Sequence, residues 1–139
     1  MKISFLPSKT VIPLVRFKHN GKSFTAMIDS GSELTFVDKD FALNNKINLK
    51  EIDNEVKLNQ LTTNHKNKVV VANVNAIMGR SKVSITGMVM SLSSLSDAFK
   101  AQYDEDITID LLIGSDFLDA NKAKINFERK TFSMKTSNI

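Results

Sequence analysis

One carboxylate is a candidate for chemistry because of its place in the chain. Asp29 ends the apolar run of residues 24–28 and is followed at once by Ser30 and Gly31. A hydrophobic strand that runs into a carboxylate partly removes it from water, and a glycine lets the backbone turn sharply and another chain approach. Hydrolysis by two carboxylates uses one as the base that activates a water and the other as the acid. The chain offers one carboxylate in this setting, so the second would come from a second copy.

A second apolar run near the C-terminus also ends at a glycine. Residues 107–113 are mostly apolar, Gly114 follows them, and Ser115 or Asp116 could cap a short helix. Two apolar strands that each end at a glycine turn suggest an internal pseudo-twofold arrangement. No sequence repeat is strong enough to extend that suggestion.

The segments that position Asp29 and Gly114 are predicted to be short strands. Residues 11–17 and 23–28 predict a hairpin turned at Asn20-Gly21. Further strands are predicted at 34–37, 56–61, 69–78, 83–89, 124–128 and 131–134. Asp38 is expected to cap a short helical segment, and the serine-rich residues 91–103 are expected to form a loop with at most one helical turn.

Composition favours an ordinary globular protein. The 139 residues, 42% of them hydrophobic and 24% charged, fit a single domain over residues 1–139. The chain has no cysteine, which excludes disulfides, thiolate metal sites and cysteine nucleophiles and fits a reducing compartment, so the cytoplasm is the expected location. No apolar run approaches the roughly 18 residues that span a bilayer, so no membrane is expected.

Charge and histidine content argue against several partners. The net charge of +4 comes with lysines spread along the chain, and the single tyrosine and absent tryptophan do not supply the aromatic surface that nucleic-acid binding uses, so no nucleic acid is expected. His19 and His65 are not at metal-ligand spacing. We expect no metal and no cofactor.

The order of these parts resembles that of the retropepsin-like aspartic proteases, from about Ile12 to Met134. A hairpin runs into Asp-Ser-Gly, a flap hairpin and a strand pair follow, and an apolar-apolar-Gly signature precedes a short helix and a last hairpin. The resemblance implies an all-β protein with the closed β-barrel of the acid proteases and one short helix near the C-terminus. It also implies an aspartic endopeptidase that works as a homodimer on a peptide or protein substrate.

The resemblance assigns roles to six residues at the two strand ends. Asp29 would be the catalytic carboxylate, Ser30 would hydrogen-bond across the dimer, and Gly31 would make the tight turn. Leu112, Ile113 and Gly114 would pack beneath the active-site loop, with Gly114 allowing a close approach that a side chain would block.

The resemblance also places a substrate-binding flap, with its tip at Thr62, Thr63, Asn64 and His65. The sequence departs from the family here, because no glycine occurs between Gly31 and Gly79 although flap tips often contain one. Ser32 also stands where alanine is common in the family.

Other interpretations of the motif stay open. Asp29 could form an Asx turn with its own backbone. The fold could serve as a catalytically silent module that binds a peptide or protein, or the basic chain could recruit acidic partners or nucleic acid. A serine nucleophile elbow is excluded because Ile28 stands where that motif needs a glycine. Alternating apolar residues near both termini could pair between subunits, namely Met1, Ile3, Phe5, Phe132 and Met134.

Overall fold

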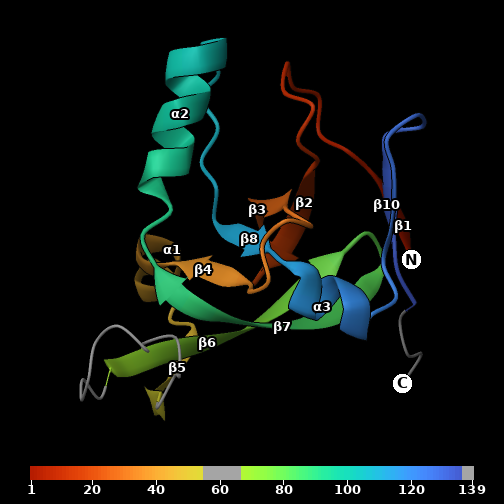
Figure 1. Ribbon diagram of the computed structural model, residues 1–139. Helices are drawn as coiled ribbons and strands as arrows, with labels where there is room; N and C mark the ends of the chain where they lie inside the picture. The colour runs from red at the N-terminus through yellow and green to blue at the C-terminus, as the bar shows by residue number, and fades with distance from the viewer. Residues whose placement is uncertain (55–66, 136–139) are drawn as a thin grey trace.

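The computed structural model describes residues 1–54 and 67–135 (Figure 1). Its strands are β1 (Lys2–Ser4), β2 (Leu14–His19), β3 (Lys22–Ile28), β4 (Phe36–Asp38), β5 (Asn48–Asn54), β6 (Asn67–Met78), β7 (Ser81–Met90), β8 (Leu111–Ile113), β9 (Lys124–Asn126) and β10 (Thr131–Ser133). Its helices are α1 (Lys39–Asn44), α2 (Ser93–Tyr103) and α3 (Ser115–Ala120). The predicted strand at 56–61 and the flap residues Thr62, Thr63, Asn64 and His65 lie outside the described residues.

The larger sheet closes into a barrel. Its strands follow the order β2-β3-β8-β4-β7-β6-β5, and β2 also pairs with β6 at Lys18 and Ile77, so six strands form a closed ring with β5 on its edge. The pairs β3–β8 and β4–β7 are parallel, and the other pairs of the ring are antiparallel. The predicted all-β fold with a closed barrel is confirmed.

The hairpin that leads into Asp29 follows from its turn residues. Asn20 and Gly21 both have positive φ angles, of 49° and 78°, which is the backbone that a two-residue turn needs to match the twist of its strands. The turn fixes the register, which pairs Leu14 with Met27 and Phe17 with Phe24. Because side chains alternate between the two faces of a strand, this register also decides which residues of β3 face the core.

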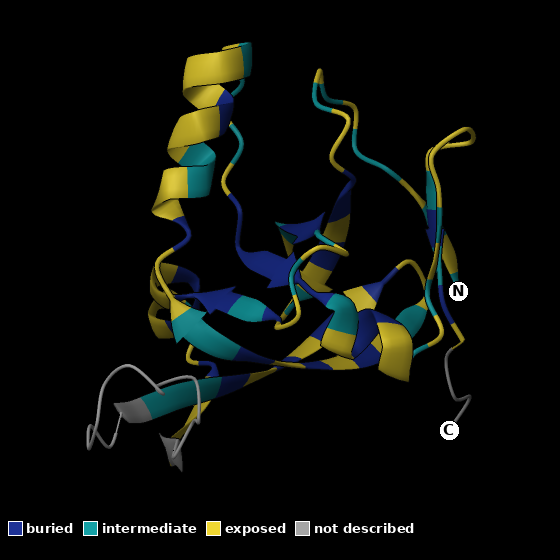
Figure 2. Ribbon diagram, in the orientation of Figure 1, coloured by how far each residue is buried: buried dark blue, intermediate teal, exposed yellow. Residues whose placement is uncertain are grey.

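Two groups of buried apolar side chains stabilise the molecule (Figure 2). The larger group fills the barrel and includes Phe17, Ile28, Val74, Ile85 and Ile113. The smaller group, which we call the α2 cluster, combines three barrel residues with three residues from the segment between β7 and β8. Its buried members are Leu14, Met27, Leu112, Leu92, Phe99 and Ile109.

The prediction of a loop at residues 91–103 was wrong, because α2 occupies Ser93–Tyr103. The apolar residues Leu92, Leu95, Phe99 and Tyr103 recur at intervals of three and four, and all of them pack in the α2 cluster. That spacing is the signature of one helix face, although the serines between these residues obscure it. The described residues therefore contain α2 in addition to the two short helical segments expected after Asp38 and near the C-terminus.

Both chain ends enter a separate small sheet of order β1-β10-β9. Ile3 pairs with Phe132, and the amino group of Met1 donates to the Met134 carbonyl oxygen at 3.2 Å. Both edges of β10 are used within the chain, so Phe132 is not on an edge strand as expected. β1 is an edge strand of this sheet, and its pairing between subunits stays a prediction. Among the described residues, no helix is long and apolar enough to cross a membrane.

Candidate functional site

Asp29 lies directly after β3, on a loop that leaves the barrel. Its backbone N–H donates to the Ile113 carbonyl oxygen at 2.9 Å, which anchors the loop to β8. Its half-buried carboxylate accepts the Gly31 N–H on Oδ1 at 3.0 Å. This is the Asx turn considered above, and it orients the carboxylate while using one oxygen. In the described part of the chain, Oδ2 accepts no hydrogen bond and remains available for water.

Ser30 and Gly31 are exposed at the tip of the same loop. A Cβ atom on Gly31 would stand 3.3 Å from Asp29 Oδ1, which is closer than most side chains tolerate. Glycine at this position therefore keeps the carboxylate oxygen accessible. The exposure of Ser30 leaves its hydroxyl free to meet another molecule that approaches the loop.

The strand beside β3 fixes what stands opposite Asp29. In the parallel pair, Met27 lies opposite Leu112 and Ile28 opposite Ile113, so the next position opposite Asp29 is Gly114. A Cβ atom on Gly114 would overlap the Leu34 carbonyl and approach the Ser32 carbonyl oxygen to 2.7 Å. The two loops can pack this closely only because Gly114 has no side chain. The pseudo-symmetric position therefore supplies no second carboxylate.

A buried hydroxyl that sequence reasoning missed connects the two loops. Thr35 is 1% exposed, and its Oγ1 donates to Asp116 Oδ1 at 2.7 Å and accepts the Gly114 N–H at 3.1 Å. The Thr35 N–H donates to Asp116 Oδ2 at 3.2 Å. Both oxygens of Asp116, a possible helix cap by sequence, bind Thr35, and Oδ1 also accepts the Phe117 N–H at 2.7 Å. Gly114 occupies the cap position of α3. The partners are 81 positions apart in the sequence, so no local pattern reveals the contact.

Backbone hydrogen bonds complete the attachment of the Asp29 loop to α3. The Ser115 N–H donates to the Ser32 carbonyl oxygen at 2.7 Å, and the Asp116 N–H donates to the Glu33 carbonyl oxygen at 3.2 Å. The Ser32 hydroxyl donates to the Leu34 carbonyl oxygen at 2.7 Å. These bonds hold the loop from both sides, so the position of the Asp29 carboxylate is set before any ligand binds.

Two carboxylates away from Asp29, those of Asp38 and Asp110, are buried. Asp38 accepts the Phe41 N–H at 3.1 Å, as the predicted cap of α1, and the Leu92 N–H at 2.8 Å. Asp110 accepts the Thr25 N–H at 3.0 Å. Burial raises the pKa of Asp110 to about 6; the hydrogen bond from Thr25 opposes the rise, and the negative charge of Asp38 adds to it. These carboxylates are structural, because their oxygens serve backbone groups that connect α1, the start of α2 and β3.

The arrangement around Asp29 suits acid–base chemistry on a water molecule. A fixed, partly exposed carboxylate with one free oxygen can orient a water and accept its proton. Within residues 1–54 and 67–135, no three His, Cys, Asp or Glu side chains are placed to hold a metal ion.

Comparisons with known proteins agree with this geometry. The family model described as "Aspartyl protease" matches residues 15–117, which include Asp29, Thr35, Gly114 and Asp116. No curated protein matches the sequence.

Two solved structures are similar over nearly the whole chain. The retroviral protease-like domain of Ddi1 from Leishmania major is 15% identical with a TM-score of 0.57, over 94% of this chain and 92% of that one. A retropepsin-like aspartic protease from Rickettsia conorii is 18% identical with a TM-score of 0.55, over 95% of this chain and 88% of that one. At these identities the similarity establishes the retropepsin-like fold.

Proposed function

Because the chain belongs to the aspartyl protease family, we propose that it is an aspartic endopeptidase that acts as a homodimer on peptide or protein substrates. The observation that carries this proposal is the position opposite Asp29. Gly114 stands there, and Asp116 is bound to Thr35, so neither offers a partner carboxylate. A symmetric second copy would bring its own Asp29 to the first across the loop tips.

The proposed reaction divides its two proton transfers between the two Asp29 carboxyl groups. The ionised one accepts a proton from water as the water oxygen bonds to the peptide carbonyl carbon, and the protonated one donates to the carbonyl oxygen. Both transfers then reverse. The carboxyl group that took the proton of the water gives it to the leaving nitrogen as the carbon–nitrogen bond breaks, and the other carboxylate takes a proton back from the diol, so a carboxylic acid and an amine are released. Two carboxyl groups that share one proton titrate as a pair, so activity should show a bell-shaped pH profile.

The variant Asp29→Asn tests the proposal. An amide has the size of a carboxyl group but cannot accept the proton of the water, so kcat should fall by a factor of about 10² to 10⁴. Circular dichroism and sedimentation should show an unchanged fold and dimer. A variant that retains full activity would remove Asp29 from the mechanism.

The alternative is a retropepsin fold that binds a peptide or protein without cleaving it. A wild-type dimer that binds peptides from a library with measurable Kd but leaves them intact at every pH would favour this binding module over the protease.

A further inference from the structure

Two lysines and an isoleucine form a row across the outside of the barrel. β2 pairs with β6 at Lys18 and Ile77, and β6 pairs with β7 at Ile77 and Lys82. Residues directly opposite each other in antiparallel strands point to the same side of the sheet, so the three side chains share the outer face. All three are exposed, and Ile77, at 42%, stands between the two lysines.

A hollow of about 540 Å³ lies along this row. The row itself, the turn at Asn20 and Gly21, and the side chains of Asn75 and Ser84 line it. None of the described residues that line it is an aspartate or a glutamate. The hollow therefore offers one large apolar side chain with hydrogen-bonding groups and positive charge around it.

The lack of acidic residues extends over four strands that are consecutive around the barrel. Within their bounds, β3, β2, β6 and β7 contain no Asp or Glu, although the chain has 15 such residues. The exposed basic residues of these strands and of the β6–β7 turn are Arg16, Lys18, Lys22, Arg80 and Lys82. In the described part of the chain, none of these five is in an ion pair. Charges of one sign without neutralising partners attract a ligand of the opposite sign.

Hydrogen-bonding side chains continue the same face beside the row. Asn73 and Asn75 on β6 and Ser84 and Thr86 on β7 are exposed and alternate with buried residues. Asn73 Oδ1 accepts the Ser84 hydroxyl at 2.9 Å, and Asn73 Nδ2 donates to Thr86 Oγ1 at 3.4 Å. Amide and hydroxyl groups can donate to carboxylates and to peptide carbonyl groups. Together with the row, these four residues form what we call the basic face.

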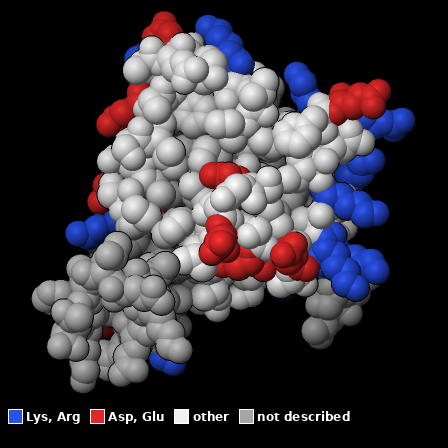
Figure 3. Space-filling view, in the orientation of Figure 1, with Lys and Arg blue, Asp and Glu red and all other residues white. Residues whose placement is uncertain are grey.

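The basic face lies at the end of the β2–β3 hairpin that is farther from Asp29. Ser23 pairs with Lys18, and Ser23 and Asp29 are six positions apart in the sequence. At about 3.3 Å for each residue of a strand, the row is about 20 Å from the carboxylate. Figure 3 shows acidic side chains gathered over the Asp29 loop and α3. An extended peptide that reaches both places therefore needs at least about six residues between them.

We propose that the basic face binds an acidic segment of the protein substrate, in which carboxylates flank an apolar residue. The carboxylates meet Lys18 and Lys82, and the apolar side chain packs on Ile77. This proposal rests on the proposed function, because it names the class of substrate that the protease holds at a distance from Asp29.

The side chains of the basic face favour a peptide over a nucleic acid. Single-stranded nucleic acids bind to aromatic rings on which their bases stack, and no residue of the basic face is aromatic. The exposed side chain of Ile77 gains nothing from a phosphate group, but it buries apolar area against an apolar side chain. An acidic peptide with an apolar residue matches both the charge and the centre of the face.

Binding of a labelled peptide tests the basic face without cleavage. The probe is fluorescein-labelled Glu-Glu-Leu-Glu-Glu, and fluorescence anisotropy at low salt gives its Kd for the Asp29→Asn protein. Adding Lys18→Glu and Lys82→Glu should raise Kd about tenfold or more, because like charges then face the peptide. The matched control adds Lys39→Glu and Lys124→Glu, which change the net charge equally at exposed lysines elsewhere, and it should leave Kd nearly unchanged. Equal rises in both proteins would overturn the proposal.

Ile77→Thr tests the apolar contact. Threonine keeps the branched side chain that strands favour but offers less apolar area. The Kd of Glu-Glu-Leu-Glu-Glu should rise several-fold, and the Kd of Glu-Glu-Ser-Glu-Glu should stay the same. If a short uridine oligonucleotide binds more tightly than the peptide, and Ile77→Thr does not weaken the peptide, the basic face serves nucleic acid and the proposal is wrong.

Kinetics connect the basic face to cleavage. Two substrates share the sequence that the wild type cleaves best in a peptide library. A flexible linker of about ten residues joins one of them to Glu-Glu-Leu-Glu-Glu and the other to Gln-Gln-Leu-Gln-Gln. The acidic substrate should have the lower KM and the same kcat. Lys18→Glu with Lys82→Glu should abolish the difference in KM and leave kcat unchanged.

The outcomes separate this proposal from the proposed function. If the wild type cleaves both substrates with the same KM and the acidic peptide does not bind, the basic face is not a docking site, yet the protease assignment stands. If the peptide binds through Lys18 and Lys82 but no substrate is cleaved at any pH, the proposed function fails, and with it the claim that the acidic segment belongs to a substrate.

Discussion

Thr35 shows how one buried hydroxyl can decide the geometry of a distant carboxylate. Its Oγ1 serves both the Gly114 N–H and Asp116, and the residue itself ends the loop that begins at Asp29. Gly114 is buried and packs against the Ser32 and Leu34 carbonyls, so its N–H has no access to another acceptor. The hydroxyl therefore keeps the Asp29 loop and the end of β8 at one fixed separation.

We expect Thr35→Val to lower the free energy of unfolding by about 2–4 kcal/mol. Valine has nearly the same shape, but it leaves the Gly114 N–H without its acceptor and removes a donor from Asp116, and an unpaired buried polar group costs about 1–3 kcal/mol. Urea unfolding measures the loss. Thr35→Ser keeps the hydroxyl and should lose less than about half as much; equal losses in the two variants would show that the methyl group matters more than the hydrogen bonds.

Asp110 should make stability depend on pH in a direction that is unusual for a carboxylate. Its folded pKa of about 6 lies above the value of about 4 for an unfolded chain, so the folded state binds the proton more tightly. The cost of ionising it is absent below about pH 4, grows between pH 4 and 6, and is complete above about pH 6. Two pH units correspond to about 3 kcal/mol.

Asp110→Asn should remove this dependence because an amide does not titrate. The unfolding free energy of the variant minus that of the wild type should rise by about 3 kcal/mol between pH 4 and 7, as measured by urea unfolding across that range. A flat difference for Asp110→Asn would mean that Asp110 titrates normally in the folded protein.

At the residue scale, the sequence predicts features that depend on residues adjacent in the chain. The apolar run into Asp29-Ser30-Gly31 identifies the candidate acid, and Asn20-Gly21 identifies the turn that sets the register before it. The Thr35–Asp116 contact and the burial of Asp110 are not local properties. They depend on which strands become neighbours, so neither residue differs in sequence from an ordinary surface threonine or aspartate.

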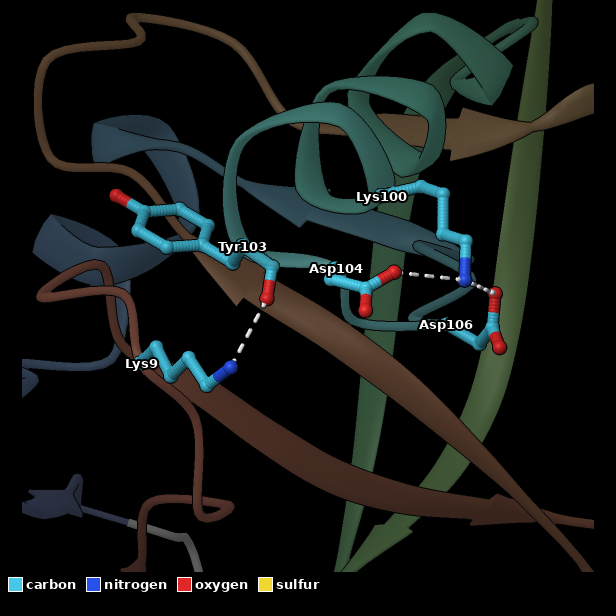
Figure 4. Close-up of polar contacts among 5 residues, drawn as sticks. All are labelled: Lys9, Lys100, Tyr103, Asp104 and Asp106. Atoms are coloured by element: carbon cyan, nitrogen blue, oxygen red, sulfur yellow. Dashed lines mark hydrogen bonds and ion pairs between the residues drawn. The ribbon is translucent and has the colours of Figure 1, made fainter.

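At the scale of elements, α2 connects the side of the barrel to the segment before β2, because Lys9 donates to the carbonyl oxygen of its last residue, Tyr103 (Figure 4). Its residue Phe99 is 5% exposed and packs with Leu14, Met27 and Leu112, all from strands at the site. Asp38 accepts the N–H of Leu92, the residue before the helix, and Glu105 after the helix accepts the Ser8 hydroxyl and the Lys9 N–H. The helix is therefore fixed at both ends and along one face.

Phe99→Ala should lower the free energy of unfolding by about 3–5 kcal/mol, because a large buried aromatic side chain is removed and leaves a cavity. Hydrogen exchange of the α2 amides should also become faster, since the helix loses its main anchor. Gln102→Ala, at an exposed residue of the same helix, should change neither quantity. A global loss below about 1 kcal/mol would mean that the α2 cluster is not part of the cooperative core.

Elements with strong local signals were predicted well, and α2 was not. The β2–β3 hairpin, β7 and the β9–β10 hairpin follow from turn residues and alternating apolar positions. In α2 the apolar residues form a stripe only one residue wide along the helix, and the serines between them in the sequence favour turns and caps. The packing of Phe99 against the barrel outweighs that local preference, and no pattern within α2 itself reports the packing.

At the scale of the whole molecule, the closed barrel holds one candidate carboxylate at the end of one strand. The proposed activity therefore belongs to a pair of molecules. In a mixture, subunits of wild type and Asp29→Asn would exchange between dimers, and a mixed dimer would have one acid and one amide. Such a dimer lacks the shared proton of the proposed mechanism.

An excess of Asp29→Asn should therefore inhibit the wild type. With nine parts of variant to one of wild type and complete exchange, about a tenth of the wild-type subunits remain in dimers with two acids, so activity should fall to about a tenth. Adding the same amount of a folded, unrelated protein is the control. Activity that stays proportional to the wild-type concentration would show that each chain works alone.

The small sheet β1-β10-β9 has a consequence for the connectivity of the fold. Ile3 and Phe132 are paired neighbours, and the Met1 and Met134 backbones exchange two hydrogen bonds, so the first and last strands of the described chain lie side by side. The chain is thus nearly a ring in space, opened between two adjacent strands. A short peptide could join Met1 to Lys135, and the chain could be opened in the exposed turn at Asn20 and Gly21, with every described strand pairing retained. The strand pairings, and not the position of the chain ends, therefore determine this fold.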